Sequence, residues 1–337
     1  MRVHQIEGDW GIEHLRMSTR PDPAPGPGQV LLKMLASSLN YRDLVVLGRG
    51  YGNFTGTLPL VPLSDGVGEV VAVGAGVERV AVGDRVCPMF FPDWIAGDPD
   101  LSRLTQSLGG PLDGTMSEFM VLPETGVARV PAALDHEQAA CLPCAGLTAW
   151  RALAVLGTTR PGDQVLIQGS GGVALFALQF ARLFGAHVTV ISSSDEKIGR
   201  LVAMGADATV NYSRTPDWAR ATREITGGRG YDQIIEVGGE KTLPQSLRCI
   251  RPGGTISMIG VLSGAAMQAS LGHVVTRQVR LQGVTVGTRD DFEQMCRAIA
   301  QHGVAPVVDR VFGFDELVPA FERLKSGAQF GKICIRH

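Results

Sequence analysis

The chain has 337 residues, of which 45% are hydrophobic and 19% charged, and its formal net charge is −2. This composition is ordinary for a soluble globular protein, and the length favours two domains. The near-neutral charge argues against nucleic acid as a partner, because a protein that binds phosphate backbones needs a strong basic excess. We find no apolar run of about 18 residues and no signal peptide, so we expect no membrane span and a cytoplasmic location.

Residues 1–125 carry few helix signals. The segment 29–36 is an apolar strand, and glycines interrupt the valine-rich segments 66–73 and 77–86. Short strands broken by turn residues in this way predict an antiparallel, barrel-like β domain.

From about residue 136, helices and strands alternate. Asp135 can cap a helix over 136–141, Pro143 interrupts it, and a second helix is expected over 145–156. The alternation implies βαβ units and a doubly wound parallel sheet, with its ligand at the carboxyl ends of the strands. The expected strands of this sheet are 164–168, 187–192, 208–212, 232–237, 255–260 and 280–286. Amphipathic helices near 290–302 and 315–326 and a strand at 332–336 follow, and this last segment can return to the first domain.

The most specific feature is a glycine turn that contains Gly169, Gly171 and Gly172. It follows the expected strand 164–168 and precedes an expected helix over 173–184. Glycines let the backbone turn tightly and approach a pyrophosphate, and the helix N-terminus offers N–H groups to the phosphates. A glycine-rich turn without a ligand is the other interpretation, but strand, turn and helix in register favour nucleotide binding.

Six cysteines are scattered along the chain, and the length does not call for disulfides. Cys141 and Cys144 have Cys-x-x-Cys spacing within an alanine-rich helical stretch. We therefore expect them to pack in the core rather than to act in redox chemistry.

Five motifs occur in the order typical of one family. They are Ser-Leu-Asn-Tyr-Arg-Asp at 38–43, Val-Gly-Asp-Arg-Val at 82–86, Gly-Thr-Met-Ser-Glu-Phe at 114–119, Ala-Gly-Leu-Thr-Ala-Trp at 145–150 and Gly-Ser-Gly-Gly-Val at 169–173. With these motifs the chain resembles the medium-chain dehydrogenase/reductase superfamily, specifically its zinc-free quinone oxidoreductase and enoyl reductase-like branch. The resemblance covers essentially the whole chain.

The resemblance implies an α/β fold with a GroES-like β-barrel catalytic domain plus a Rossmann domain built on a doubly wound parallel sheet. The expected division is a catalytic domain of residues 1–127 and 289–337 and a Rossmann domain of residues 128–288. The resemblance also implies a nicotinamide cofactor and often a homodimer.

No metal is expected. Zinc-dependent relatives that the chain resembles place a cysteine where this chain has Tyr41 or Arg42, and Gly-His-Glu around Leu63, Ser64 and Asp65. Of these side chains only Asp65 could ligate, whereas catalytic zinc needs about three Cys, His or acidic ligands.

The end of the second Rossmann strand distinguishes NADH from NADPH. An acidic residue there would accept from the ribose 2′-OH and repel a 2′-phosphate. This chain has Ser192 and Ser193, with Lys197 nearby to add positive charge. Tyr212 matches a tyrosine that lines the adenosine phosphate in the quinone reductase branch. A serine-rich helix entry without phosphate selectivity is the alternative, and we expect NADPH.

Other cofactor-binding residues are expected from the glycine turn and the resemblance. Thr148 matches a threonine beside the nicotinamide, and the backbone near Gly260 should approach the nicotinamide amide. The remaining set is Gly169, Ser170, Gly171, Gly172, Val173, Gly238, Gly260, Val261, Leu262 and Lys332.

Hydride transfer to an activated alkene leaves an enolate, which needs a hydrogen-bond donor when no metal is present. Tyr51 resembles the proposed proton donor of the enoyl reductase branch; the other interpretation is that it only lines the pocket. Asn40 looks like the family's cofactor- or substrate-facing amide, and these two are the expected catalytic residues. The expected substrate-facing residues are Asn40, Tyr41, Tyr51, Asp65 and Phe91.

Two neighbouring features remain open. Arg42 is expected to contact substrate or to pair with Asp43 or Asp65, and Asp43 to hold the loop rather than to act as a base. The aromatic residues before the long insertion 93–111, Phe91 among them, either cap the substrate cleft or pack beneath the loop.

The leading prediction is an NADPH-dependent, zinc-free oxidoreductase that transfers hydride to a quinone or an α,β-unsaturated carbonyl compound. An alcohol dehydrogenase of the same fold and a non-catalytic nucleotide-binding protein are the alternatives. The expected partners are a small-molecule substrate and a second copy of the chain, paired through the edge strand 280–286 into a homodimer.

Overall fold

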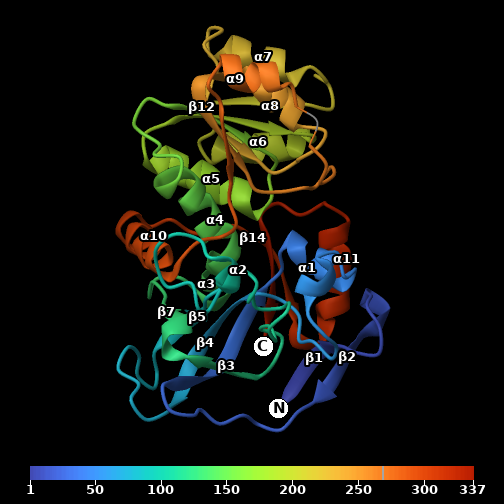
Figure 1. The fold of residues 1–337 in the computed structure, drawn as a ribbon, viewed down its shortest axis with the longest axis vertical. Helices are drawn as coiled ribbons and strands as arrows, with labels where there is room; N and C mark the ends of the chain where they lie inside the picture. The colour runs from blue at the N-terminus through green and yellow to red at the C-terminus, as the bar shows by residue number, and fades with distance from the viewer. Residues whose placement is uncertain (268) are drawn as a thin grey trace. The chain divides into compact units, whose positions relative to one another are not determined.

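Our computed structural model describes residues 1–267 and 269–337, apart from the side chain of Asn53. The chain forms two compact units (Figure 1), of which the first contains Met1–Leu147 and Val286–His337 and the second Thr148–Thr285. No helix in the described part of the chain is long and apolar enough to cross a membrane.

These boundaries differ from the expected ones at 127/128 and 288/289. Helix α3 (His136–Ala140) packs against strands of the first unit, and this contact places the segment 128–147 in that unit. Asp135 caps α3 as expected, because its carboxylate accepts from the backbone N–H of Gln138 at 2.7 Å.

The main sheet of the first unit has the strand order β14-β15-β3-β4-β5-β7, and β6 also pairs with β3. Neighbouring strands are antiparallel, except that β14 and β15 are parallel. The C-terminal strand β15 pairs with β3 in this sheet, so red and blue strands lie together in Figure 1. The strands are β3 (Gln29–Ser38), β4 (Asp65–Val73), β5 (Arg85–Pro88), β6 (Phe119–Pro123), β7 (Val127–Arg129), β14 (Val308–Gly313) and β15 (Lys332–Arg336); β1 (Arg2–Ile6) and β2 (Leu15–Thr19) form a separate pair.

Alternation along β3 explains the barrel-like core. Val30, Leu32 and Met34 are buried while the residues between them are half-buried or exposed, as a strand with one face in the core requires. A second cluster that includes Phe321 and Ile335 lies against the C-terminal helix. The helices of this unit are α1 (Tyr41–Leu47), α2 (Leu101–Leu104), α3, α10 (Arg289–His302) and α11 (Leu317–Lys325).

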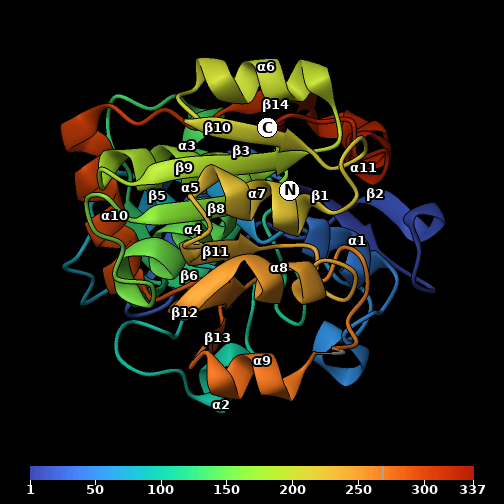
Figure 2. The same ribbon diagram turned by 90° about the horizontal axis from the view of Figure 1, so that it is seen from above.

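The second unit is a six-stranded, fully parallel sheet with the order β10-β9-β8-β11-β12-β13. Figure 2 shows the strands side by side in this order. The order reverses between β8 and β11, and such a switch point is where doubly wound sheets bind ligands. The strands are β8 (Gln164–Gln168), β9 (His187–Ser192), β10 (Ala208–Asn211), β11 (Tyr231–Glu236), β12 (Ile250–Met258) and β13 (Arg280–Gly283).

The expected α/β fold, with a GroES-like barrel and a Rossmann sheet, is confirmed. Residues 165–168 of β8 are all buried, as expected for a parallel strand covered on both faces. The segment 142–155 contains π-helical turns at Leu142–Gly146 and Arg151–Val155 around a short α4 (Leu147–Trp150), where a continuous helix over 145–156 was expected. The helices that follow are α5 (Gly172–Leu183), α6 (Asp195–Ala203), α7 (Trp218–Ile225), α8 (Leu243–Cys249) and α9 (Leu271–Thr276).

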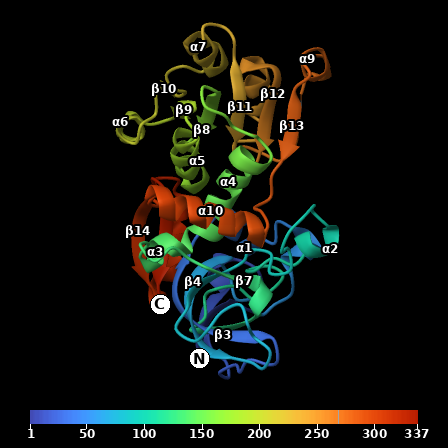
Figure 3. The same ribbon diagram turned by 90° about the vertical axis from the view of Figure 1, so that its left-hand side faces the viewer.

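Strand β13 lies at the edge of the sheet and is shorter than the expected 280–286. Figures 2 and 3 show α9 next to it, and the α9 side chains of Leu271 and Val275 are exposed. Pairing of this edge across a two-fold axis stays a prediction.

Candidate active site

Four polar residues of the first unit form a buried group, which we call the Lys332 cluster: Asn40, Ser64, Asp65 and Lys332. Strand pairing brings them together, because β3 pairs with both β4 and β15. Ser38, near the end of β3, faces Asp65 on one side and Cys334 on the other. Asn40 follows that end of β3 and precedes α1, so its side chain meets the first residues of β4 and β15.

The ammonium of Lys332 lies at the centre of this cluster. Its Nζ donates to the Leu39 backbone oxygen at 2.6 Å and to Asn40 Oδ1 at 2.5 Å. The same Nζ lies 3.8 Å from Asp65 Oδ2, and the exposed fractions of the two side chains are 4% and 0%. Lys332 was expected to bind cofactor; in this structure its ammonium is engaged within the first unit.

Asp65 is held by neighbours on both carboxylate oxygens. The Ser64 hydroxyl donates to Oδ1 at 3.1 Å, and the Cys144 backbone N–H donates to Oδ2 at 3.2 Å. Burial raises the pKa of Asp65, while Lys332 and the hydrogen bonds from Asn40, Ser64 and Cys144 oppose that rise. Asp65 is thus the acidic partner of Lys332 in this cluster, at 3.8 Å.

Arg42, on α1, binds the insertion 93–111 through hydrogen bonds. Its guanidinium donates to the backbone oxygens of Leu108 and Gly110 at 2.8 and 3.1 Å. It also lies over the Phe90 ring, 4.6 Å from its centroid, and over the Tyr51 ring at 6.0 Å. Arg42 thus fixes the surroundings of Tyr51, and its nearest carboxylate oxygen on Asp43 is 3.9 Å away.

Asp43 is buried in the first turn of α1. Its Oδ2 accepts from the backbone N–H of Asn40 at 2.7 Å, whereas Oδ1 has no hydrogen-bond partner among the described residues. Burial raises the pKa of Asp43 to about 6, although Arg42 and the Asn40 N–H oppose the rise. The carboxylate holds the start of α1, as expected for a structural residue.

The expected substrate-facing residues divide into two groups. Tyr41 and Tyr51 are 46% and 44% exposed, so both side chains are accessible on the first unit. Burial raises the pKa of Tyr51, and the phenol therefore stays protonated at neutral pH. Phe91, by contrast, is buried and contacts the Phe90 and Trp94 rings at centroid distances of 4.6 and 6.0 Å, so it packs beneath the loop.

The side chains at the zinc-ligand positions do not fit a zinc ion. Tyr41 points to an exposed surface, Arg42 binds backbone oxygens, and Ser64 donates to Asp65. Within residues 1–267 and 269–337, no three His, Cys, Asp or Glu side chains converge as metal ligands would. A buried ammonium 3.8 Å from Asp65 also repels a cation.

The glycine turn of the second unit fits a dinucleotide. Gly169 has φ +82° and Gly171 precedes the first residue of α5, and a Cβ added at either would meet nothing within 4 Å. The space over this backbone, together with the N–H groups that open α5, suits a pyrophosphate. Ser170 is buried in the turn, and Gly172 and Val173 begin the helix.

A buried glutamate joins the two strands of the switch point. Glu236 ends β11, is 1% exposed, and accepts from Gln168 Nε2, at the end of β8, at 2.6 Å. Its oxygens also accept from the Gly238 and Gly239 N–H groups and from the Thr242 and Ser246 hydroxyls. Glu236 was not among the expected site residues; the signal in the sequence was an acidic residue directly after the apolar pair Ile234 and Ile235.

Two segments follow the carboxyl ends of β11 and β12. Gly238 and Gly260 leave no room for a side chain, whereas the side chains of Val261 and Leu262 are exposed. A Cβ at Gly238 would lie 2.2 Å from Thr242 Oγ1, and one at Gly260 would lie 2.3 Å from the Val237 oxygen. Val261 and Leu262 are half exposed, at 50% and 51%. These positions follow the carboxyl ends of β11 and β12, as expected, whereas Thr148 is buried at 3% exposed.

The end of β9 places the expected phosphate-binding residues together. Ser192 is buried, and its backbone oxygen accepts from the N–H of Tyr212 at 3.0 Å. Ser193 is exposed, and Lys197 lies in the first turn of α6. The nearby carboxylate of Asp195 accepts from Asn211 and pairs with Arg214, so its negative charge is balanced locally.

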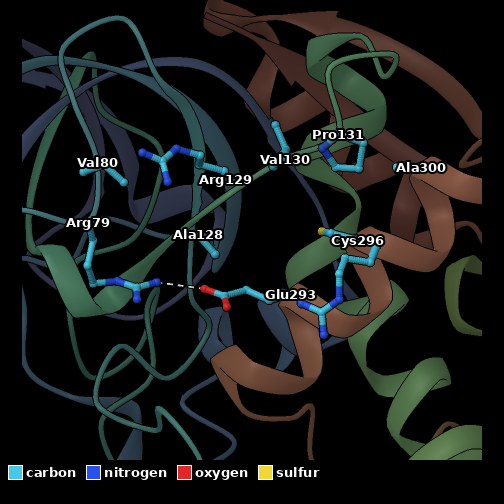
Figure 4. Close-up of a pocket in the computed structure, with 10 residues that line it drawn as sticks. Arg79, Val80, Ala128, Arg129, Val130, Pro131, Glu293, Cys296 and Ala300 are labelled. Carbon is cyan, nitrogen blue, oxygen red and sulfur yellow. Dashed lines mark hydrogen bonds and ion pairs between the residues drawn. The ribbon is translucent and has the colours of Figure 1, made fainter.

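A cavity of about 420 Å³ opens elsewhere on the first unit, between β7 and α10 (Figure 4). Arg79 and Glu293 pair across it at 2.8 Å, as the dashed line in Figure 4 marks. Its lining residues include no member of the Lys332 cluster and none of the expected site residues. The cavity is therefore separate from the groups expected to do chemistry.

Comparison with known proteins decides the family. Residues 26–132 match the alcohol dehydrogenase GroES-like domain, and residues 172–301 match the zinc-binding dehydrogenase domain. A zinc-type alcohol dehydrogenase-like protein of Schizosaccharomyces pombe is 42% identical over 92% of this chain and 91% of its own length. The chain belongs to the medium-chain dehydrogenase/reductase superfamily.

This superfamily member also resembles solved structures throughout its length. A putative alcohol dehydrogenase from Sinorhizobium meliloti superposes with a TM-score of 0.93 at 42% identity, covering 100% of this chain and 98% of that one. An NAD-dependent alcohol dehydrogenase gives 0.91 at 33% identity, with full coverage of both chains. The protein is therefore an alcohol dehydrogenase-like oxidoreductase.

Two further relatives act on, or bind, other molecules according to their names. Acryloyl-coenzyme A reductase of Metallosphaera sedula is 30% identical over 93% of this chain and 94% of its own length. The crotonyl-CoA carboxylase/reductase AntE, solved with NADP, has a TM-score of 0.86 at 25% identity, covering 100% of this chain and 94% of that one.

Replacing Glu236 by alanine should destabilise the protein by about 3 kcal/mol or more. The substitution leaves the Gly238 and Gly239 N–H groups and three side-chain donors without their acceptor in a buried site. Urea unfolding measures the loss, and Glu224→Ala, at an exposed position on α7, is the control with a change within about 0.5 kcal/mol. A loss under about 1 kcal/mol for Glu236→Ala would contradict the assignment.

Asp43 should make stability fall as the pH rises from about 4 to about 6. Its pKa is about 6 in the folded state against an ordinary 3.8, so the folded protein keeps a proton that the unfolded chain releases. Asp43→Asn removes this loss, and its stability relative to the natural protein should rise by about 2 kcal/mol between about pH 4.5 and pH 7. Urea unfolding of both proteins at the two pH values is the measurement, and a constant difference would refute the prediction.

Proposed function

We propose that this protein is an NADPH-dependent oxidoreductase that transfers hydride to a quinone or an α,β-unsaturated carbonyl compound without a metal ion. The observation that carries the proposal is the Lys332 cluster. Its positive charge comes from a side chain of the protein, and its carboxylate is already balanced by that charge. A site of this kind offers no metal ion to act as a Lewis acid. It therefore favours a substrate whose negatively charged product can be stabilised by hydrogen-bond donors alone.

The chemistry of reduction sets what the residues must do. A bound nicotinamide cofactor supplies the hydride. Addition at the β-carbon of an enone moves negative charge to the carbonyl oxygen, and a quinone spreads the same charge over its ring. The protein must therefore place a donor at that oxygen or deliver a proton to the α-carbon.

Tyr51 and Asn40 are the residues suited to that work. The Tyr51 phenol is accessible and protonated, so it can donate a hydrogen bond or a proton. Asn40 is half-buried at the start of α1 and carries an amide NH₂ group. The Arg42 guanidinium lies 6.0 Å from the centroid of the Tyr51 ring, and a positive charge there favours a developing anion.

The end of β9 supports NADPH over NADH. Ser193 is exposed, Lys197 is on the adjoining helix turn, and Tyr212 is 40% exposed. The carboxylate of Asp195, at the start of α6, is paired with Arg214, so its repulsion of a 2′-phosphate is reduced. The solved relative that contains NADP gives independent support.

Oxidation of simple alcohols is the second candidate function. It is favoured by the relatives that are named alcohol dehydrogenases, one of them NAD-dependent. The acryloyl-coenzyme A reductase favours the first candidate, since its named substrate is an activated alkene. The zinc-ligand positions of this chain weigh against the alcohol reaction of the zinc enzymes.

Cofactor titration followed by a substrate panel separates the two candidates. Fluorescence titration should give NADPH at least about tenfold tighter binding than NADH, because only NADPH carries the 2′-phosphate. NADPH should then be consumed with enones and quinones, while simple alcohols with NADP⁺ or NAD⁺ give little turnover. Preference for NADH together with alcohol oxidation would overturn the proposal, and binding without any turnover would favour a non-catalytic protein.

Replacing Tyr51 by phenylalanine should lower kcat by about a hundredfold, since it removes the proton donor and keeps the ring. The KM for NADPH should stay unchanged, because the substitution lies in the first unit and leaves the glycine turn intact. The control is Glu224→Ala at an exposed position on α7, outside the expected site, and it should change kcat by less than about threefold. Equal effects of the two substitutions would contradict the assigned role.

A further inference from the structure

The cavity beside α10 is lined by one side of that helix and by two segments that face it. Four residues of α10, spaced by three and four positions, share the side toward the cavity: Glu293, Cys296, Arg297 and Ala300. The segments 79–80 and 128–131 form the other wall, as Figure 4 shows. Every lining residue belongs to the first unit, and the volume of about 420 Å³ is within the range of small-molecule sites.

The charges of the lining side chains do not balance. Three of them are the guanidinium groups of Arg79, Arg129 and Arg297, and one is the carboxylate of Glu293. Arg129 pairs at 2.8 Å with Asp84, which lies outside the lining. Arg297 is exposed, and within residues 1–267 and 269–337 no carboxylate oxygen lies within 4 Å of its guanidinium. An unpaired guanidinium at the wall of a cavity is available to an anion.

The acidic side chain of the lining is shared between two arginines. Glu293 Oε1 accepts from Arg79 Nη2 at 2.8 Å and also lies 3.6 Å from Nε of Arg289, at the start of α10. The Nε atoms of both arginines are buried and have no hydrogen-bond acceptor among the described residues. Burial and the neighbouring Arg79 lower the pKa of Arg289, although Glu293 and Asp290 oppose the fall. Positive charge therefore predominates at this wall.

Two of the lining arginines are held in place by the protein itself. The backbone N–H of Arg79 donates to Glu124 at 2.7 Å, and the side chain of the adjacent Val80 is buried in the core. The Arg129 guanidinium donates to Asp84 through Nε at 2.9 Å. Side chains that are already held lose less conformational entropy when a ligand binds them.

Apolar groups lie beside the guanidinium groups in the same wall. Val80, Ala128 and Cys296 are buried, and Val130 and Pro131 are half-buried. A cavity that combines such a surface with cations suits a ligand that has an anionic group and an apolar body. A guanidinium binds the two oxygens of a carboxylate or a phosphate with matching geometry.

We propose that the cavity between β7 and α10 binds a small organic oxyanion, a phosphate monoester or a carboxylate whose apolar part lies against the buried side chains. Arg79 and Arg297 bind the oxyanion, and Glu293 competes with it for Arg79. The site is independent of the proposed reaction, because its lining includes no member of the Lys332 cluster and no residue of the glycine turn.

Calorimetric titration at about 0.15 M salt tests the site, with phenyl phosphate and benzoate as probes. We expect one site per chain and a Kd of about 1 mM or below for at least one of them. The tighter probe shows whether the anionic group is a phosphate or a carboxylate. Inorganic phosphate and acetate should bind at least about fivefold more weakly, because they lack the apolar body. No binding of either probe up to about 10 mM would overturn the proposal.

Two substitutions with opposite expected effects locate the binding. Arg297→Gln should weaken binding of the tighter probe by about fivefold or more, because it removes a cation of the wall. Glu293→Gln should strengthen it by about threefold or more, because the competing carboxylate is gone. The control is Arg220→Gln on α7 of the second unit, which removes the same charge from an exposed position and should change the Kd by less than about 1.5-fold.

The comparison of Arg297→Gln with Arg220→Gln decides the outcome. Arg297 is exposed, so its substitution leaves the fold intact. Equal affinities of these two variants would show that the probe binds elsewhere and would overturn the proposal. Weaker binding by Glu293→Gln would also contradict it, when urea unfolding shows that this variant is as stable as the natural protein.

Discussion

The structure of the first unit depends on burying one positive charge. Transfer of an ammonium group from water to the interior is unfavourable unless it is paired and hydrogen-bonded. Lys332 meets that condition with the Leu39 backbone oxygen, Asn40 and the Asp65 carboxylate, which come from three different segments of the chain. The ammonium therefore links the C-terminal end of β3 to the first residues of β4 and β15.

Residues that are expected to contact substrate lie next to the Lys332 cluster in the chain or are held by its neighbours. Asn40 caps α1, and the first turn of that helix carries Arg42 and Asp43. Arg42 in turn binds the backbone of the insertion loop and lies over the Tyr51 ring. Asn40 is therefore bound directly to Lys332, whereas Tyr51 is connected to the cluster only through Arg42 on the same helix as Asn40.

A buried acidic residue has the corresponding place in the second unit. Glu236 is buried at the switch point of the sheet and is satisfied by five N–H and O–H donors instead of a cation. These contacts join β8 to β11 and order the glycines that follow β11. The loops over which a dinucleotide would lie are thus held from below by a fully hydrogen-bonded carboxylate.

Local patterns could be predicted from the sequence, and contacts between distant residues could not. The bounds of β8 and β9 match the expected strands, and the glycine turn has the positive φ at Gly169 that its chemistry requires. The contact of Lys332 with Asn40, by contrast, could not be predicted, because the two residues lie 292 positions apart in the sequence. The packing of Phe91 and the hydrogen bonds of Glu236 depend in the same way on residues far along the chain.

The π-helical turns and the domain boundaries also could not be predicted from local sequence patterns. The π-helical turns on either side of α4 replace an expected continuous helix, although alanine and leucine there favour ordinary α-helix. Helix α3 lies in the first unit because of its packing against β3, β4 and β15, which no change of composition at residue 127 signals.

The proposed metal-free reaction requires that no zinc ion binds where Lys332 pairs with Asp65. Zinc content by mass spectrometry, after incubation with Zn²⁺ and dialysis, tests it most directly when paired with NADPH turnover before and after chelation. We expect zinc far below one ion per chain and turnover unaffected by the chelator. One zinc per chain, with turnover lost on chelation and restored by Zn²⁺, would contradict it.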